Sequence, residues 1–438
     1  MKLSLTGDSI LFRRLNSRND PQSKSLFDLI RGCDVSFTNL ELVPNDFEGD
    51  PALDHGGTHF GARSWVLDEL RDAGFDLFAA ATNHSLDYSI SGLRKSIAEM
   101  EKRELCYAGV GVNLDEARRP VYCTRPAGTV AMLSCVSTFA RGQEAAPQTS
   151  SMPGRPGVNP LRFTTTHHVT KEEMAQLLAI YARLGLERDH AQKVYLGFAY
   201  PRQPGSVQFG GTTFVEGDET RSVLTANESD VGDIIRWVRE ARLVSDLVVV
   251  SVHSHESGYN GQGQIDVETP CDFLKNFSRR VMDEGADVVV CHGPHLLRGM
   301  EIYKGRPIFY SLGNFIGQNE LVERLPAESY SVNRAPLDLT PHQVYKKRSE
   351  NDRKGFPSDR RFWQTILPIC DFRDGKLIGI DILPVSLGWG KSAHARGCPY
   401  LATGSEATEI LDRFVALSEG CADMLSREGC RLFWRPSR

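Results

Sequence analysis

The chain has 438 residues, a formal net charge of −5 at neutral pH and 24% charged residues. Its apolar content of 40% is ordinary for a globular protein, so the chain can bury a sizeable core. No basic stripe is visible, which argues against nucleic acid as the main partner because phosphate neutralisation needs clustered Lys and Arg. The ten cysteines form no C-x-x-C pair and indicate reduced, buried thiols rather than a disulfide framework or a zinc-thiolate site.

The first residues lead directly into a predicted strand. No charged segment followed by an apolar one precedes it, and no run of about 18 apolar residues occurs in the sequence. We therefore expect a cytoplasmic protein with no membrane segment.

Short apolar runs alternate with amphipathic helical segments over residues 1–120 and 225–320. Continuous apolar runs of this length suit strands that are covered on both faces. Alternating strands and helices predict βαβ units in a layered, largely parallel α/β fold, with β-sheets flanked by helices. The predicted strands, in chain order, are Lys2–Thr6, Asp34–Thr38, Asp76–Ala81, Leu247–Val252, Asp287–Cys291 and Pro307–Ser311.

The alternation breaks in two places. Residues 140–225 are rich in Gly, Pro, Ser and Thr around one helical segment and indicate a long insertion or lid on a single core. Residues 321–360 form a second polar stretch, which we expect to be a loop. Residues 361–438 then supply strands and a helix that complete the fold, so we expect one domain over residues 1–438.

Each predicted strand ends in a small polar cluster. Ligands bind beyond the carboxyl ends of parallel strands, so these side chains are expected to converge. Oxygen and imidazole donors without thiolate suit Mn, Fe or Zn in an open catalytic site. The set exceeds the needs of one ion and favours two divalent metal ions that share a carboxylate and activate a hydroxide. The candidates are Asp8, Asn39, Glu41, Asn83, His84, His253, His255, Glu256, His292, His295 and Asn314.

Each candidate also has a structural interpretation. Asp8 can cap a turn, Glu41 can be a solvated acid, and Asn314 is more typical of a turn than of a ligand. His253 and His255 are expected to point in opposite directions, which makes one of them structural. The hypothesis therefore depends on the convergence of the whole set.

Five stretches taken together resemble the CapA family, the capsule or poly-γ-glutamate synthesis proteins. They are residues 6–11, 37–43, 73–93, 249–257 and 285–316, with the motifs N-H-x-x-D-Y at 83–88 and S-L-G-N-F at 311–315. Residues 396–418 are similar to the closing segment of that family. The resemblance implies the calcineurin-like metallophosphoesterase fold.

The resemblance also implies roles for individual residues. His84 would be the acid that protonates the leaving group, and Asp87 would either orient His84 or cap the helix near Ser89. The metal ligands that the resemblance implies are Asp8, Glu41, Asn83, His253, His292 and His295. Beside the resemblance, we expect Arg298, just after His295, to steer an anionic substrate or to be a solvated surface charge. The supporting or substrate-contacting residues that we expect are Asn39, His255, Glu256, Arg298 and Asn314.

Three departures from the family pattern matter. Ile10 stands where metallophosphoesterases usually have the histidine of D-x-H, which weakens the first metal site. Gly293 stands where a ligand is expected, so His292 must reach the metal from one position earlier. No anchoring or export segment is present, so a different substrate or role is expected.

The function that we expect is a CapA-like, dinuclear metal-dependent hydrolase linked to poly-γ-glutamate or capsule metabolism. A metal-activated hydroxide would attack a phosphoester or a γ-glutamyl or other amide bond in an anionic small molecule or polymer. The alternative is a non-catalytic, metal-containing accessory protein that binds a polyanionic polymer or a synthetase. Loss of the D-x-H histidine favours this alternative, whereas retention of His84 and of both histidines at 292 and 295 counts against it.

Overall fold

The computed structural model describes residues 1–15, 20–418 and 420–436. The chain divides into two compact units, one of Met1–Leu161 with Gly232–Arg438 and one of Arg162–Val231. The predicted insertion is therefore shared between them, because residues 140–161 belong to the first unit and residues 162–225 to the second. A lid function for the second unit stays a prediction.

The first sheet has the strand order β23-β24-β21-β20-β1-β2-β3-β4, with β19 beside β1 and β22 beside β21. Its parallel strands are β1 (Lys2–Ile10), β2 (Val35–Leu40), β3 (Leu77–Ala79), β4 (Cys106–Ala108) and β19 (Asn314–Gly317). Its antiparallel strands are β20 (Gln364–Arg373), β21 (Lys376–Ser386), β22 (Tyr400–Leu401), β23 (Leu425–Glu428) and β24 (Arg431–Trp434).

The second sheet has the order β17-β18-β16-β13-β7-β6. Its central strands are parallel, and its two edge strands run antiparallel to their neighbours. The strands are β6 (Val121–Arg125), β7 (Gly128–Val136), β13 (Leu247–His253), β16 (Val288–His292), β17 (Met300–Tyr303) and β18 (Arg306–Phe309). All six predicted strands are present, three in each sheet, but the first sheet is mixed rather than largely parallel.

The two sheets share one apolar core. Leu5 and Phe37 of the first sheet lie in the same buried cluster as Met132, Val249 and Val290 of the second. Burial of these side chains from both sides explains why the strands are continuous apolar runs. This packing brings β1 against β16, and with it the carboxyl ends of strands from both sheets.

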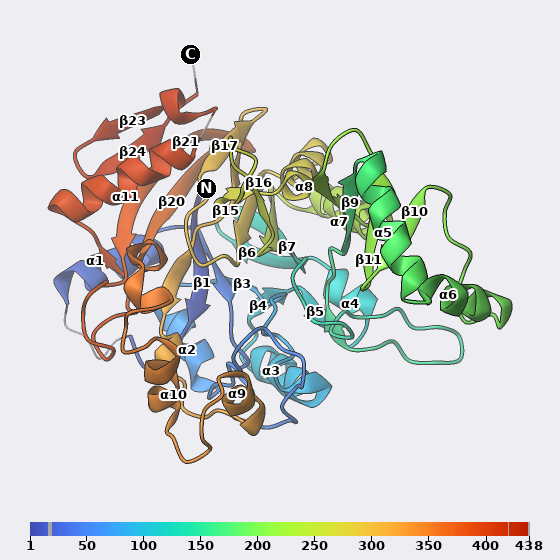
Figure 1. Ribbon diagram of the computed structural model, residues 1–438. Helices are drawn as coiled ribbons and strands as arrows, with labels where there is room; N and C mark the ends of the chain where they lie inside the picture. The colour runs from blue at the N-terminus through green and yellow to red at the C-terminus, as the bar shows by residue number, and fades with distance from the viewer. Residues whose placement is uncertain (16–19, 419, 437–438) are drawn as a thin grey trace. The chain divides into compact units, whose positions relative to one another are not determined.

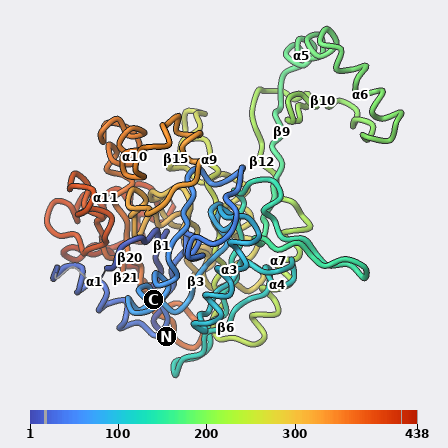
Figure 2. Tube along the Cα trace, turned by 90° about the horizontal axis from the view of Figure 1, so that it is seen from below, coloured from blue at the N-terminus to red at the C-terminus, as the bar shows by residue number. Residues whose placement is uncertain are grey.

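Helices cover the outer faces of the sheets, and α11 covers the inner face of the first sheet, because its Ile410 and Phe414 belong to the cluster that the two sheets share. α1 and α11 lie against the β20–β22 part of the first sheet (Figures 1 and 2), and α8 packs on β16. In α8, the predicted apolar face is buried, with Phe277 and Val281 in its centre. The helices of this unit are α1 (Pro21–Arg31), α2 (Trp65–Ala73), α3 (Ser89–Lys102), α4 (Leu114–Arg118), α8 (Asp272–Asp283) and α11 (Gly404–Leu417), and α7 (Glu228–Val244) begins in the other unit. This arrangement confirms the predicted class, an α/β fold with sheets flanked by helices.

The second unit has its own sheet, of order β10-β11-β9-β12. Its small core is formed by Val169, Met174, Tyr181 and Val207. The predicted helix is present but is split in two, and the Gly-rich stretch forms the β10–β11 hairpin. The elements are β9 (Phe163–Val169), α5 (Lys171–Arg183), α6 (Leu186–Tyr195), β10 (Ser206–Phe209), β11 (Thr212–Glu216) and β12 (Arg221–Ala226).

Short elements complete the first unit. The prediction of a loop over residues 321–360 is wrong, because this stretch contains α9 (Ala327–Val332) and α10 (Pro341–Arg348). Thr340 caps α10 in a capping box with Gln343. The remaining elements are β5 (Val110–Gly111), β8 (Gly157–Val158), β14 (Ser257–Tyr259), β15 (Ile265–Pro270), η1 (Asn319–Leu321), η2 (Phe356–Ser358), η3 (Arg360–Trp363) and η4 (Ala422–Met424). Within the described ranges, every helix is too short or too polar to cross a bilayer.

Candidate metal centre

The centre is built around β1, which pairs in parallel with strands on both of its sides. Asp8 on β1 lies in register with Asn39 of β2 and Asn314 of β19. The backbone N–H of Asp8 donates to the carbonyl oxygen of Gly313 at 2.9 Å. This approach requires glycine at position 7, because a Cβ there would lie 1.8 Å from the same oxygen.

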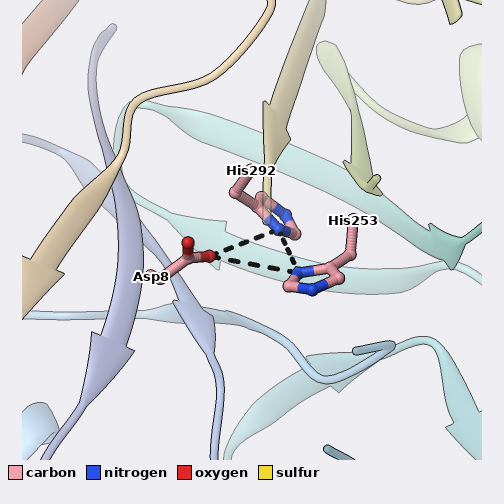
Figure 3. Close-up of side chains that lie close together, drawn as sticks. All are labelled: Asp8, His253 and His292. Carbon is pink, nitrogen blue, oxygen red and sulfur yellow. Dashed lines mark hydrogen bonds and ion pairs between the residues drawn. The ribbon is translucent and has the colours of Figure 1, made fainter. Parts of the chain in front are cut away.

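A first group of donors comprises Asp8, His253 and His292, all fully buried (Figure 3). His253 and His292 are register partners at the ends of β13 and β16, so their rings lie side by side. Their Nδ1 atoms are 3.0 Å apart and lie 4.0 Å and 3.7 Å from Oδ1 of Asp8. Three donor atoms from two sheets therefore face one another.

A second group comprises Glu41, His255 and His295. Nδ1 of His295 lies 3.6 Å from Oε2 of Glu41 and 3.2 Å from Oδ2 of Asp8. Nε2 of His255 lies 3.2 Å from Nε2 of His253. The two groups are thus adjacent, and Asp8 and His253 are the members of the first group that contact the second.

The chemistry of these donors fits divalent metal ions. Neither carboxylate oxygen of the fully buried Glu41 has a hydrogen-bond partner among the described residues, and a buried anion without a partner is costly. Burial and the neighbouring Asp8 carboxylate raise the pKa of Glu41 well above its usual range. Burial lowers the pKa of His255 to about 3 and that of His292 to about 4, which keeps both rings in the neutral form that binds metals.

His84 and Asp87 form a buried pair beside the second group. Nδ1 of His84 lies 2.7 Å from Oδ2 of Asp87, and Nε2 of His84 lies 4.0 Å from Oε1 of Glu41. The ring of Phe60 stacks on His84 with 4.2 Å between centroids. Helix α3 begins at Ser89 without a side-chain cap, so the geometry matches the orienting alternative for Asp87 rather than the capping one.

Three amide side chains contact the donor groups. Oδ1 of Asn83 lies 2.8 Å from Nε2 of His253, and Asn39 donates from Nδ2 to Oδ1 of Asp8 at 2.8 Å. Oδ1 of Asn314 lies 2.9 Å from Nδ1 of His295. All three amides therefore contact members of the donor groups, and the implied role of Asn83 as a metal ligand stays a prediction.

Both histidines at the end of β13 reach the centre, and the expectation that one would point away is wrong. Residues two apart along a strand lie on the same face, so alternation does not separate His253 from His255. Strand β13 ends at His253, and the ring centroids of the two histidines are 5.1 Å apart. His255 therefore belongs to a donor group rather than to the supporting residues.

The turn after β16 likewise brings both of its histidines to the centre. Gly293 adopts φ of +121°, a conformation that favours glycine, and His295 lies in the left-handed region at +63°. His292 presents Nδ1 to Asp8, while its Nε2 lies 2.7 Å from Oγ of Ser251. His292 thus reaches Asp8 without a donor at position 293.

Glu256 and Arg298 lie outside the donor groups. Glu256 accepts hydrogen bonds from the hydroxyls of Ser137, Thr138 and Ser254. Arg298 is 1% exposed and donates to the backbone carbonyl oxygens of residues 255, 256 and 267. The surface-charge interpretation of Arg298 is therefore wrong, since the guanidinium holds the loop that carries His255.

A sequence model described as bacterial capsule synthesis protein PGA_cap matches residues 2–319. The chain belongs to this family. The match includes every candidate residue of the centre and confirms the resemblance to CapA proteins.

Relatives of this PGA_cap protein differ in how much of their length they share with it. An uncharacterized protein of Sinorhizobium fredii, y4sH, is 32% identical over 94% of this chain and 88% of its own length. The PGA biosynthesis protein CapA of Bacillus subtilis is 25% identical over 56% of this chain and 44% of its own. A probable polyglutamine synthesis accessory protein of Mycobacterium tuberculosis is 24% identical over 55% and 45%.

Among solved structures, the chain is similar to a putative 5′-nucleotidase from Staphylococcus aureus in complex with α-ketoglutarate. The TM-score is 0.38 at 11% identity, over 94% of this chain and 58% of that one. At this TM-score the likeness supports no conclusion about the PGA_cap chain.

A cavity of about 470 Å³ opens over the second donor group. His84, His255 and His295 line it, so a bound molecule would meet the centre and the His84–Asp87 pair together. Tyr345, Arg348 and Phe356 also line it, and they lie in the stretch that we expected to be a loop. The signal that could have revealed α10 is Thr340 and Pro341 followed by Gln343, which is typical of a helix start.

Proposed function

We propose that this PGA_cap protein is a dinuclear metal-dependent hydrolase that cleaves a γ-glutamyl amide bond in an anionic substrate. The observation that carries the proposal is the pair of adjacent donor groups with His84 and Asp87 beside them. One divalent ion (Mn, Fe or Zn) would be held by Asp8, His253 and His292, and a second by Glu41, His255 and His295 with Asn83 nearby. Bound ions would supply Lewis-acid activation of water and stabilise negative charge in the transition state.

His84 is the proposed general acid. Asp87 accepts the Nδ1 proton, which leaves Nε2 as the ring atom directed toward Glu41. A protonated Nε2 would donate to the leaving group as the scissile bond breaks. Phe60 packs on the ring and donates from its backbone N–H to the same Asp87 oxygen, so the orientation of the pair is held from two sides.

The substrate class is supported by two observations. The Bacillus subtilis relative is named for poly-γ-glutamate (PGA) biosynthesis, and the exposed Arg348, which has no carboxylate partner among the described residues, lines the cavity over the centre. A cationic side chain at a cavity favours anionic ligands. Dinuclear metal sites also hydrolyse phosphoesters, so a phosphoester substrate is included in the test.

The alternative function is that of a metal-containing accessory protein without turnover. The Mycobacterium tuberculosis relative is named as an accessory protein. In this chain Ile10 is fully buried in an apolar cluster, so no donor comes from the position of the D-x-H histidine. The donor groups are compatible with such a role, since binding requires no general acid.

Metal analysis of the purified protein, paired with assays of wild type and His84→Ala, separates these functions. The substrates are a γ-glutamyl oligomer and a chromogenic phosphodiester. If the protein is a hydrolase, both proteins should contain two metal equivalents, the wild type should turn over a substrate, and His84→Ala should not. Two equivalents without turnover in either protein would favour the accessory function, and under one equivalent with no difference between the proteins would contradict both.

A further inference from the structure

Helix α10 places two side chains in the wall of the cavity. Tyr345 and Arg348 are three residues apart and so share one face of the helix, and both line the cavity with His84 and His295. Thr58 lies across from them on the loop before Phe60. The capping box of Thr340 and Gln343 fixes the start of α10 and so the position of this face.

Arg348 lacks the partner that nearby cations have. Lys346 pairs with Asp352, and Lys354 pairs with Glu350. Arg348 donates to Oγ1 of Thr58 at 3.1 Å, and no carboxylate in the described part of the chain forms an ion pair with it. Arg348 is exposed and lines the cavity, so the remaining N–H donors of its planar guanidinium are available to a bound anion.

Tyr345 provides a further indication of a ligand. Its hydroxyl oxygen is buried and lies close enough to the side chain of Thr58 to affect its pKa, but it forms no well-aligned hydrogen bond with a described residue. Buried polar atoms are almost always paired, so an unpaired one at a cavity wall suggests that a bound molecule pairs it. The hydroxyl and the fork of Arg348 are together suited to one planar oxyanion.

The wall around this polar face is apolar. Phe356 and Phe362 stack at 4.3 Å between centroids, and Phe356 also contacts the ring of His295 at 5.2 Å. Pro357 and Val267 extend this surface. A ligand that fits such a cavity has methylene groups along its length and charged groups at intervals.

We propose that Arg348, Tyr345 and Thr58 form a subsite for a carboxylate of the substrate, one or more units away from the bond that is cleaved. The proposal rests on the proposed function in placing the scissile bond at His84. A γ-linked glutamate chain has the required chemistry, with two methylene groups and one free carboxylate in each unit. The subsite makes Arg348 a specificity-determining residue and leaves the chemical step to the metal centre.

Equilibrium binding tests the subsite without turnover. The full-length protein carrying His84→Ala is titrated with a four-unit γ-glutamate oligomer and with the same oligomer amidated at every free carboxylate. We expect Arg348→Ala to lower the affinity for the carboxylate oligomer by about 10- to 100-fold, the usual range for a charged hydrogen-bonded pair. The affinity of Arg348→Lys should lie between those of the parent and Arg348→Ala. Tyr345→Phe should lower the affinity several-fold.

Arg353→Ala is the matched control. Arg353 is an exposed cation five residues away that does not line the cavity and donates to the carbonyl oxygen of Glu350. The control should bind both oligomers as the parent does. Equal affinity of the parent and Arg348→Ala for the carboxylate oligomer would overturn the subsite, as would an equal loss with the amidated oligomer.

Steady-state kinetics distinguish failure of the subsite from failure of the proposed function. In the otherwise wild-type protein, Arg348→Ala should raise KM for the oligomer with little change in kcat. It should leave turnover of a phosphodiester that lacks a carboxylate unchanged. Turnover with an unchanged KM would reject the subsite alone. Arg348-dependent binding by a protein that turns over neither substrate would reject the hydrolase and leave the subsite standing.

Discussion

Nδ1 of His84 lies 2.7 Å from Oδ2 of Asp87, and this oxygen also accepts the backbone N–H of Phe60 at 2.8 Å. The other carboxylate oxygen of Asp87 is buried and has no partner among the described residues. Oδ2 of Asp87 therefore bonds both the ring of His84 and the backbone of Phe60, the residue that stacks on that ring. The orientation of His84 and the position of Phe60 in the cavity wall thus depend on the same carboxylate oxygen.

This relationship predicts different effects for the two residues. His84→Ala removes the proposed acid, and kcat should fall by about 10²- to 10⁴-fold. Asp87→Asn keeps the size of the side chain but can no longer hold the Nδ1 proton as an anion, so kcat should fall less and KM should change little. Steady-state kinetics check both. Metal content should be unchanged in both variants, and loss of metal in Asp87→Asn would contradict an orienting role.

Glu41→Gln tests whether the unpartnered carboxylate is a metal ligand. The amide has nearly the same shape but no charge, so metal content should fall from two equivalents to one or fewer. The thermal midpoint should fall with it, because a bound ion at 100 times its Kd stabilises the folded state by about 2.7 kcal/mol. After chelation, wild type and variant should unfold at the same temperature. A difference that persists in chelator would indicate a purely structural role for Glu41.

His255→Ala distinguishes a direct ligand from a supporting residue. His255 belongs to the second donor group, so the variant should retain one metal equivalent and lose the other. Glu256→Gln, one residue away, changes only the hydroxyl contacts of the loop and should keep two equivalents. Elemental analysis of the two variants in parallel gives the answer. Equal metal content in both would return His255 to a supporting role.

Arg298→Ala should be strongly destabilising. The buried guanidinium donates to the carbonyl oxygens of Val267 and Glu256 at 2.8 Å and 2.9 Å, and its removal leaves them without donors. We expect the free energy of unfolding to fall by about 3 kcal/mol. Chemical denaturation of chelated protein measures this loss without a contribution from metal. A change below about 0.5 kcal/mol, usual for a surface substitution, would contradict the structural role.

Sequence patterns predicted the strands and the polar residues that end them. Apolar runs such as Val288–Cys291 reveal burial, and the residues that follow them break the run. Five of the six predicted strands end within two residues of the observed ends, but β1 runs to Ile10 rather than Thr6. The division of strands between two sheets could not be predicted, because an apolar run has the same composition in either sheet. His255 was misjudged because residues two apart along a strand share a face, so alternation gives no reason for it to point away from His253.

Several of the missed elements have little burial, although the buried strand β7 was missed as well. Only Val344 of α10 is fully buried, so the helix has no apolar stripe and its sequence is typical of a loop. The strands of the second unit are polar and partly exposed, as in Phe163–Val169, and carry no clear alternation. The cavity wall formed by Tyr345 and Arg348 was missed for the same reason, since the hydrophobic pattern shows which residues enter a core but not which face a ligand.

The pairing of β1 with β19, where Gly7 approaches Gly313, has a consequence for synthesis on the ribosome. Asp8 emerges among the first residues, but its partner strand β19 and the histidines at 292 and 295 follow almost 300 residues later. A nascent chain therefore cannot assemble either donor group until about two thirds of it has been made. If the donor groups bind metal ions as proposed, metal binding would follow only once residues from both parts of the fold have been made, and truncated products would lack the ions.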